Sequence, residues 1–125
     1  IVNKGTTAEA YFRENYPDIE LLVYEQNTET FQALLDGRGA ALAHDNTLIF
    51  GWIKDNPGFV AGVEAIGNED TIAPAVAKGD TALSEWVNAE IDTLNESGFI
   101  AEAYEKTLAP AFSSDIDPAS VLINQ

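Results

Sequence analysis

Short apolar stretches alternate with segments of helical periodicity along the first part of this chain, and this alternation limits the folds that it can adopt. The stretch Ile1–Asn3 is followed by a helical pattern over about 7–15, which ends before Pro17. Residues 19–24 and 40–43 have the length and composition of two further buried strands. Strands that alternate with helices pair in parallel and carry helices on their faces. The pattern therefore predicts an α/β fold, a three-layer Rossmann-like lobe with a mostly parallel sheet.

The rest of the chain is mainly helical in pattern. We expect further helices to end near Gly37, to cover about 46–56, to lie between Asp80 and Gly98, and to cover about 99–108. Residues 59–66 are expected to be extended, and residues 71–77 to form one more strand. Pro74 cannot donate a ladder hydrogen bond, so this strand should lie at an edge or at a crossing between domains.

The composition excludes several classes of function. Six basic residues against 21 acidic ones give a formal net charge of -15, which argues against binding to nucleic acid or to anionic membranes. The absence of Cys excludes disulfides and thiolate chemistry, and a single His excludes a His-rich metal site, so no cofactor or metal is expected. Apolar runs are too short to span a bilayer. We expect a soluble chain of one compact domain, or a fragment, that lacks its signal segment.

The turn Lys4-Gly5-Thr6-Thr7 has the features of an anion site. Gly5 allows a tight turn and a close approach of the backbone, and Thr6 can cap the following helix together with Glu9. The first amides of a helix point towards a negative group, and a small carboxylate would fit there. The alternative is that Thr6 and Glu9 are only an N-terminal cap.

Several motifs occur in one order and spacing along the chain. They are Val2–Thr7, Ala33–Arg38, Leu42–Asp45, Ala75–Asp80, and Leu94–Gly98 with Tyr104–Lys106. Together they resemble the second lobe and C-terminal part of the extracellular polar amino-acid-binding proteins of ABC transporters, solute-binding protein family 3. The resemblance implies half of a type II periplasmic-binding-protein fold plus C-terminal helices, with a free amino acid bound between two lobes.

The resemblance also implies which residues bind the ligand. They follow two strands, where α/β sheets place ligands, and are Asn3, Gly5, Thr6, Thr7, His44 and Asp45. Thr6 and Thr7 suit the carboxylate, Asp45 suits the ammonium group, and Asn3 or His44 can reach a polar side chain. Asp45 can equally cap the helix that begins at Asn46.

The resemblance further implies how the chain is organised and what it contacts. Residues 1–71 would form the ligand-binding lobe, 72–112 a crossing strand and helices that return to the first lobe, and 113–125 a polar tail with little to bury. The partners would be a free amino acid and the permease subunits of an ABC transporter, outside the cytoplasm, in the periplasm or at the cell surface. A helix face that contains Leu83, Trp86 and Leu94 lacks its partner lobe and predicts a homodimer through the C-terminal helix.

Two other functions stay open at this point. One is an enzyme on the same scaffold, as in the dehydratases that resemble this family, and the other is a lobe that mainly self-associates. No motif places a Ser or Cys nucleophile with His44, so we expect a binding protein and not an enzyme. Trp52 and Trp86 lie on apolar helix faces and are interpreted as core residues.

Overall fold

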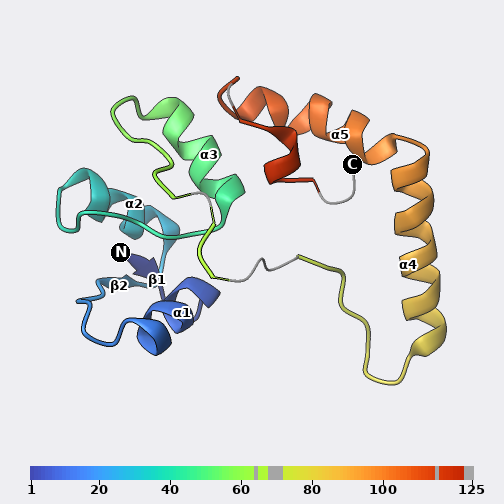
Figure 1. The fold of residues 1–125 in the computed structure, drawn as a ribbon, viewed down its shortest axis with the longest axis horizontal. Helices are drawn as coiled ribbons and strands as arrows, with labels where there is room; N and C mark the ends of the chain where they lie inside the picture. The colour runs from blue at the N-terminus through green and yellow to red at the C-terminus, as the bar shows by residue number, and fades with distance from the viewer. Residues whose placement is uncertain (64, 68–71, 115, 123–125) are drawn as a thin grey trace. The chain divides into compact units, whose positions relative to one another are not determined.

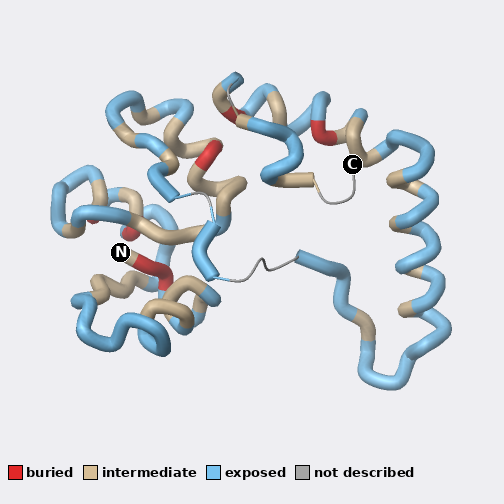
Figure 2. Tube along the Cα trace, viewed as in Figure 1, coloured by how far each residue is buried: buried red, intermediate tan, exposed pale blue. Residues whose placement is uncertain are grey.

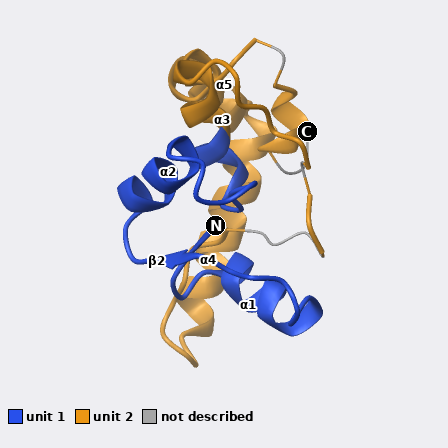
Figure 3. Cartoon of the chain, turned by 90° about the vertical axis from the view of Figure 1, so that its left-hand side faces the viewer, with its two compact units in different colours: residues 1–49 blue, residues 50–125 orange. Residues whose placement is uncertain are grey.

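The computed structural model describes residues 1–63, 65–67, 72–114 and 116–122. Its elements are β1 (Val2–Asn3), α1 (Thr7–Asn15), β2 (Val23–Tyr24), α2 (Asn27–Leu35), α3 (Asn46–Asp55), α4 (Thr81–Glu96), α5 (Phe99–Thr107) and two 3₁₀ turns, η1 (Ala109–Ala111) and η2 (Pro118–Ser120) (Figure 1). The chain divides into two compact units, residues 1–49 and residues 50–125, which Figure 3 colours separately. Each unit is described by itself below.

The first unit is built on a parallel strand pair. β1 and β2 pair in parallel, with Val2 opposite Val23 and Asn3 opposite Tyr24. α1 and α2 lie on opposite sides of this pair in both ribbon views (Figures 1 and 3). The predicted α/β fold with a parallel sheet and helices on both faces is therefore confirmed.

The predicted strand 40–43 lies beside β1, on the side away from β2. The terminal amino group of Ile1 donates to the Ala41 carbonyl at 2.7 Å, and the Ala43 amide donates to the Ile1 carbonyl at 3.0 Å. One residue that bonds to the two residues flanking its partner is the pattern of a parallel pair. The segment is too short to count as a regular strand, yet it places residues 44 and 45 next to the end of β1.

Local capping explains where α1 begins and ends. The Thr6 hydroxyl accepts a hydrogen bond from the Glu9 amide, and Tyr16 closes the last turn with a bond to the Phe12 carbonyl, just before Pro17. α2 begins with the Glu29 carboxylate accepting from a backbone amide at its start. The buried face of α2 carries Thr30 and Ala33.

The second unit has its own hydrophobic core, which joins residues of α3 to residues of α5 and of the segment after it. Phe50, Tyr104 and Phe112 are buried and form one cluster. Figure 2 colours the buried positions of the chain red. Smaller or half-buried apolar residues pack around them, namely Ile53, Ala61, Ala109, Ile116, Val121 and Leu122. The expectation that residues 113–125 have little to bury is wrong in this respect, because apolar side chains of this segment complete a core.

α4 begins and ends as the sequence predicts. The Asp80 side chain accepts from the Leu83 amide, and Gly98 follows the helix with a φ of 76°, a left-handed conformation that favours glycine. Trp86 is 62% exposed, so its interpretation as a core residue is wrong for this chain taken by itself. The rest of the predicted apolar face is exposed at Leu83 and half-buried at Val87 and Ile91.

The predicted strand 71–77 is not formed over the part that the structure describes. Residue 71 lies outside the described residues, and residues 72–77 have no regular structure. Ile72 is 89% exposed, and the backbone bond described here is a turn contact from the Asp80 amide to the Ala77 carbonyl. A strand needs a neighbouring backbone, and no described segment pairs with this one. β2 is also shorter than the predicted 19–24, because pairing with β1 covers only its last residues.

Candidate functional site

The structure brings the two predicted ligand loops to one end of the parallel segments. β1 ends at Asn3 and leads into the turn 4–6, and the extended segment beside it ends at Ala43 and leads into His44 and Asp45. Carboxyl ends of parallel strands lie at the same edge of a sheet, and this edge is where α/β proteins bind ligands.

The first loop forms the turn that the sequence predicts. Gly5 has a φ of 75°, which a residue with a Cβ rarely adopts. The Thr6 hydroxyl donates to the Asn3 carbonyl at 2.8 Å and accepts from the Glu9 amide at 3.3 Å, which starts α1. Thr7 is exposed, and no hydrogen bond joins its amide or hydroxyl to another described group. The exposed donors of this loop are therefore at Thr7.

A carboxylate of the chain itself already contacts this loop. Oε2 of Glu9 accepts from the Gly5 amide at 2.7 Å, while its Oε1 accepts from Nε of Arg13 at 2.9 Å. The hydrogen bond from Gly5, and next the one from Arg13, lower the pKa of Glu9 below its usual value. The sequence predicted Glu9 as a cap of the Thr6 helix start. Its carboxylate instead reaches the residue before the cap.

Asn3 is buried and faces α2. Asn3 is 5% exposed and Thr30 is fully buried. The Oδ1 atom of Asn3 lies 3.0 Å from the Thr30 hydroxyl. The same hydroxyl lies 2.7 Å from the Asn27 carbonyl. Asn3 therefore joins β1 to α2 beneath the loops. The sequence predicted a contact of Asn3 with a ligand side chain and did not predict this structural role.

His44 and Asp45 form a compact loop before α3. The His44 side chain is 11% exposed, its Nε2 lies 3.2 Å from Oδ1 of Asn27, and its Nδ1 accepts from the Asp45 amide at 2.7 Å. The Asp45 carbonyl accepts the first helical bond, from Ile49, so Asp45 is at the start of α3. Its side chain is 61% exposed and can pair with a cation from outside.

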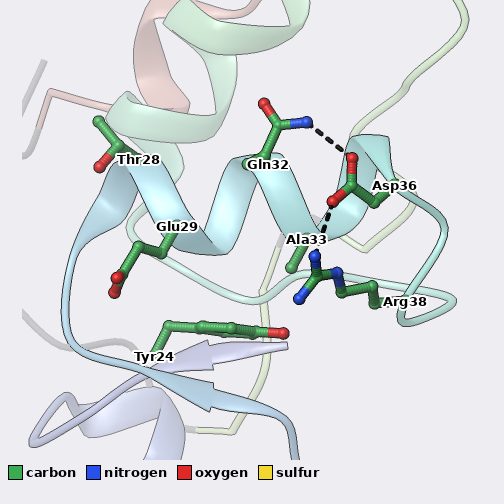
Figure 4. Close-up of a pocket in the computed structure, with 7 residues that line it drawn as sticks. All are labelled: Tyr24, Thr28, Glu29, Gln32, Ala33, Asp36 and Arg38. Carbon is green, nitrogen blue, oxygen red and sulfur yellow. Dashed lines mark hydrogen bonds and ion pairs between the residues drawn. The ribbon is translucent and has the colours of Figure 1, made fainter.

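A separate pocket of about 440 Å³ lies against α2 and β2 (Figure 4). It is lined by Tyr24, Thr28, Glu29, Gln32, Ala33, Asp36 and Arg38. Its polar groups have partners of their own, since Asp36 accepts from the Gln32 side chain at 2.7 Å and contacts the Arg38 guanidinium at 3.2 Å, while Glu29 accepts from the Gln26 amide. No predicted ligand residue lines it. Over the described residues, no group of three or more His, Cys, Asp or Glu side chains could hold a metal ion.

Comparison with known proteins identifies relatives of the chain. No family model matches it. It is 33% identical over 106 residues to the ABC transporter glutamine-binding protein of Bacillus subtilis, covering 82% of this chain and 37% of that protein. It is 25% identical over 109 residues to a putative ABC transporter arginine-binding protein of Escherichia coli, covering 84% and 45% of the two chains.

A solved structure gives a stronger match. The solute receptor for L-cysteine of Neisseria gonorrhoeae is 49% identical, with a TM-score of 0.86, over 98% of this chain and 50% of that chain. The chain is a homologue of ABC-transporter amino-acid-binding proteins. As such a homologue it has half of a type II periplasmic-binding-protein fold, as predicted. It spans half or less of the length of these relatives. These relatives are named as amino-acid-binding proteins or as a solute receptor. Within the described residues, none of the helices has the length and hydrophobicity that a membrane span requires.

Proposed function

We propose that this chain is the second lobe and C-terminal part of a binding protein that delivers a free polar amino acid to the permease subunits of an ABC transporter. The observation that carries the proposal is 49% identity to a solute receptor over 98% of the chain. The protein would act outside the cytoplasm, in the periplasm or at the cell surface, as a receptor without catalytic activity. Residues 1–71 would be the ligand-binding lobe, 72–112 would return to the first lobe, and 113–125 would be the tail.

The roles of the ligand residues follow from their chemistry and exposure. Thr7, with the first amides of α1, would donate to the ligand carboxylate, and Thr6, whose hydroxyl donates to the Asn3 carbonyl, would hold the turn that presents these donors. Asp45 would accept from the ammonium group, and its exposed carboxylate supports this assignment. His44 would lie nearest the ligand side chain. We infer that Asn3 acts from below, by fixing the end of β1 against α2, since its side chain is buried.

Isothermal titration calorimetry on the two-lobed protein that contains this chain would test the proposal. The panel would include L-cysteine, L-glutamine and L-arginine, the amino acids named for the relatives. One of the panel should bind saturably and be recovered unchanged, which separates a receptor from a dehydratase-like enzyme. The 125-residue chain alone should bind at about millimolar concentration or more weakly, because half of the ligand would face water.

Asp45→Ala should weaken binding to the two-lobed protein by about 2–5 kcal/mol, because the ammonium group would be buried without its counter-charge. Asp18→Ala is the matched control. Asp18 is also exposed, but it lies before β2, at the opposite end of the strands. If Asp45→Ala binds within about twofold of the unmodified protein while it remains folded, the assignment of the ammonium contact is wrong.

A further inference from the structure

His44 has two ring nitrogens with different partners, and these partners define its protonation state. A backbone amide can only donate, so the Asp45 amide at 2.7 Å requires a lone pair on Nδ1. The proton of the neutral ring is then on Nε2, which lies 3.2 Å from the carbonyl oxygen of the Asn27 side chain, an acceptor. Both contacts are satisfied by one tautomer only, the neutral ring protonated at Nε2.

The same contacts connect the two predicted ligand loops. His44 links Asp45 to Asn27 at the start of α2. The backbone carbonyl of Asn27 lies 2.7 Å from the Thr30 hydroxyl. This hydroxyl lies 3.0 Å from the side chain of Asn3 at the end of β1. A series of polar contacts through α2 thus lies between the two loops, in which the single hydroxyl proton of Thr30 is donated to one of its acceptors at a time.

We propose that His44 is a positioning residue, which in its neutral Nε2-protonated form clamps the Asp45 loop to α2 and releases it on protonation. The inference rests on the proposed function in one respect, that Asp45 binds the ammonium group of an amino acid. A proton added at Nδ1 would face the Asp45 amide, donor against donor. Oδ2 of Asp45, which lies 3.7 Å from Nδ1, is an acceptor that this proton could reach. The carboxylate would then pair with the imidazolium and not with the ligand.

The charged residue that contacts His44 is Asp45, and the charged residues on the neighbouring elements have partners of their own. Asp45 is the titratable group in its own loop, and Glu29 lies in the first turn of α2, where its carboxylate accepts from a backbone amide. Lys4 and Glu25, at the ends of β1 and β2, form an ion pair at 2.8 Å and so cancel each other. Protonation of the ring would therefore divert the Asp45 carboxylate, so ligand affinity should fall as the pH falls through the range in which histidine side chains protonate, about pH 8 to 5.

The first experiment needs no ligand. The chain contains one His, so the imidazole nitrogen signals in an NMR spectrum of the labelled 125-residue chain belong to His44. At pH 8 they should show the tautomer protonated at Nε2, and the Asp45 amide should shift on acidification with the same midpoint as the ring. A ring protonated at Nδ1, or an Asp45 amide that does not follow the ring, would overturn the proposal.

The second experiment measures binding by the two-lobed protein as a function of pH. Affinity for the amino acid should fall about tenfold between pH 7.5 and 5.5, as expected for a lost hydrogen bond and a diverted carboxylate. Asn27→Asp should move the pH midpoint of this fall in affinity upward, because a carboxylate at this position stabilises the imidazolium. His44→Gln keeps a donor towards Asn27 and cannot be protonated, so it should remove the pH dependence.

The two kinds of failure are distinguishable. If no amino acid binds at any pH while the NMR result is as expected, the proposed function fails and the clamp stands. If an amino acid binds and the Asn27→Asp midpoint equals that of the unmodified protein, the clamp is wrong and the receptor function stands. A purely structural role of Asn27 would change the affinity without moving the midpoint.

Discussion

Replacing Thr30 by Val should destabilise the first unit by about 2 kcal/mol. Valine has the shape of threonine, so the packing of this fully buried position is kept and only the hydroxyl is lost. The Asn3 side chain, 5% exposed, then has no partner at the 3.0 Å position, and an unsatisfied buried polar group costs about 1–3 kcal/mol. The Gln26 carbonyl keeps its helical bond to the Thr30 amide, while the Asn27 backbone carbonyl also loses its contact with the hydroxyl, at 2.7 Å.

Urea unfolding of the chain followed by far-UV circular dichroism would measure this loss. Thr30→Ser is the matched variant, because it keeps the hydroxyl and loses one methyl group, at about 1 kcal/mol. In a double-mutant cycle with Asn3→Ala, the two residues should couple by about 1 kcal/mol. The effects of the two variants could instead be additive, or Thr30→Val could change the free energy of unfolding by less than about 0.5 kcal/mol. Either result would show that Thr30 does not fix the Asn3 side chain, which would then again be a candidate ligand contact.

Two further predictions concern acid stability and association. The Gly5 amide and Arg13 lower the pKa of Glu9 in the folded chain, so this carboxylate stabilises the fold above its unfolded pKa and stops doing so as the pH falls through its folded pKa. Glu9→Gln should therefore lower the midpoint of urea unfolding at pH 7 and have little effect on it at pH 2. An equal change in this midpoint at the two pH values would contradict the prediction. The exposed Trp86 face of α4 should pair with a second copy of the chain, so sedimentation should show a concentration-dependent dimer that Trp86→Glu converts to monomer. A strict monomer at high concentration would refute the pairing.

Features with local causes could be predicted from the sequence. The bounds of α1 follow from the Thr6 cap and from Pro17, and the end of α4 follows from Gly98. The strand 71–77 could not be judged in this way. A strand forms only if another backbone pairs with it, and local composition does not reveal whether that backbone is present.

The site could be predicted only in part, for a related reason. Parallel topology brings the turn 4–6 and residues 44–45 to one edge, and topology is readable from the order of elements. The contact between Asn27 and His44 depends on how α2 packs against the strands, and no local sequence pattern predicts this packing. From the sequence, a polar residue at the start of a helix is interpreted as a cap, whether or not its side chain also contacts a distant loop.

The charge of the chain is also consistent with the ligand class that we propose. A formal net charge of -15 repels a simple anion and attracts a simple cation over the whole surface. An amino acid with one carboxylate and one ammonium group has no net charge, so the overall field neither repels nor attracts it and only the local groups act. At this edge the groups proposed to bind the ligand are the amides at the start of α1 and the Asp45 carboxylate, one positive end and one negative, while the Glu9 carboxylate there is paired with Gly5 and Arg13. A donor group and a carboxylate at one edge fit a zwitterion better than an anion or a cation, and the acidity of the remaining surface repels free anions from the same amides.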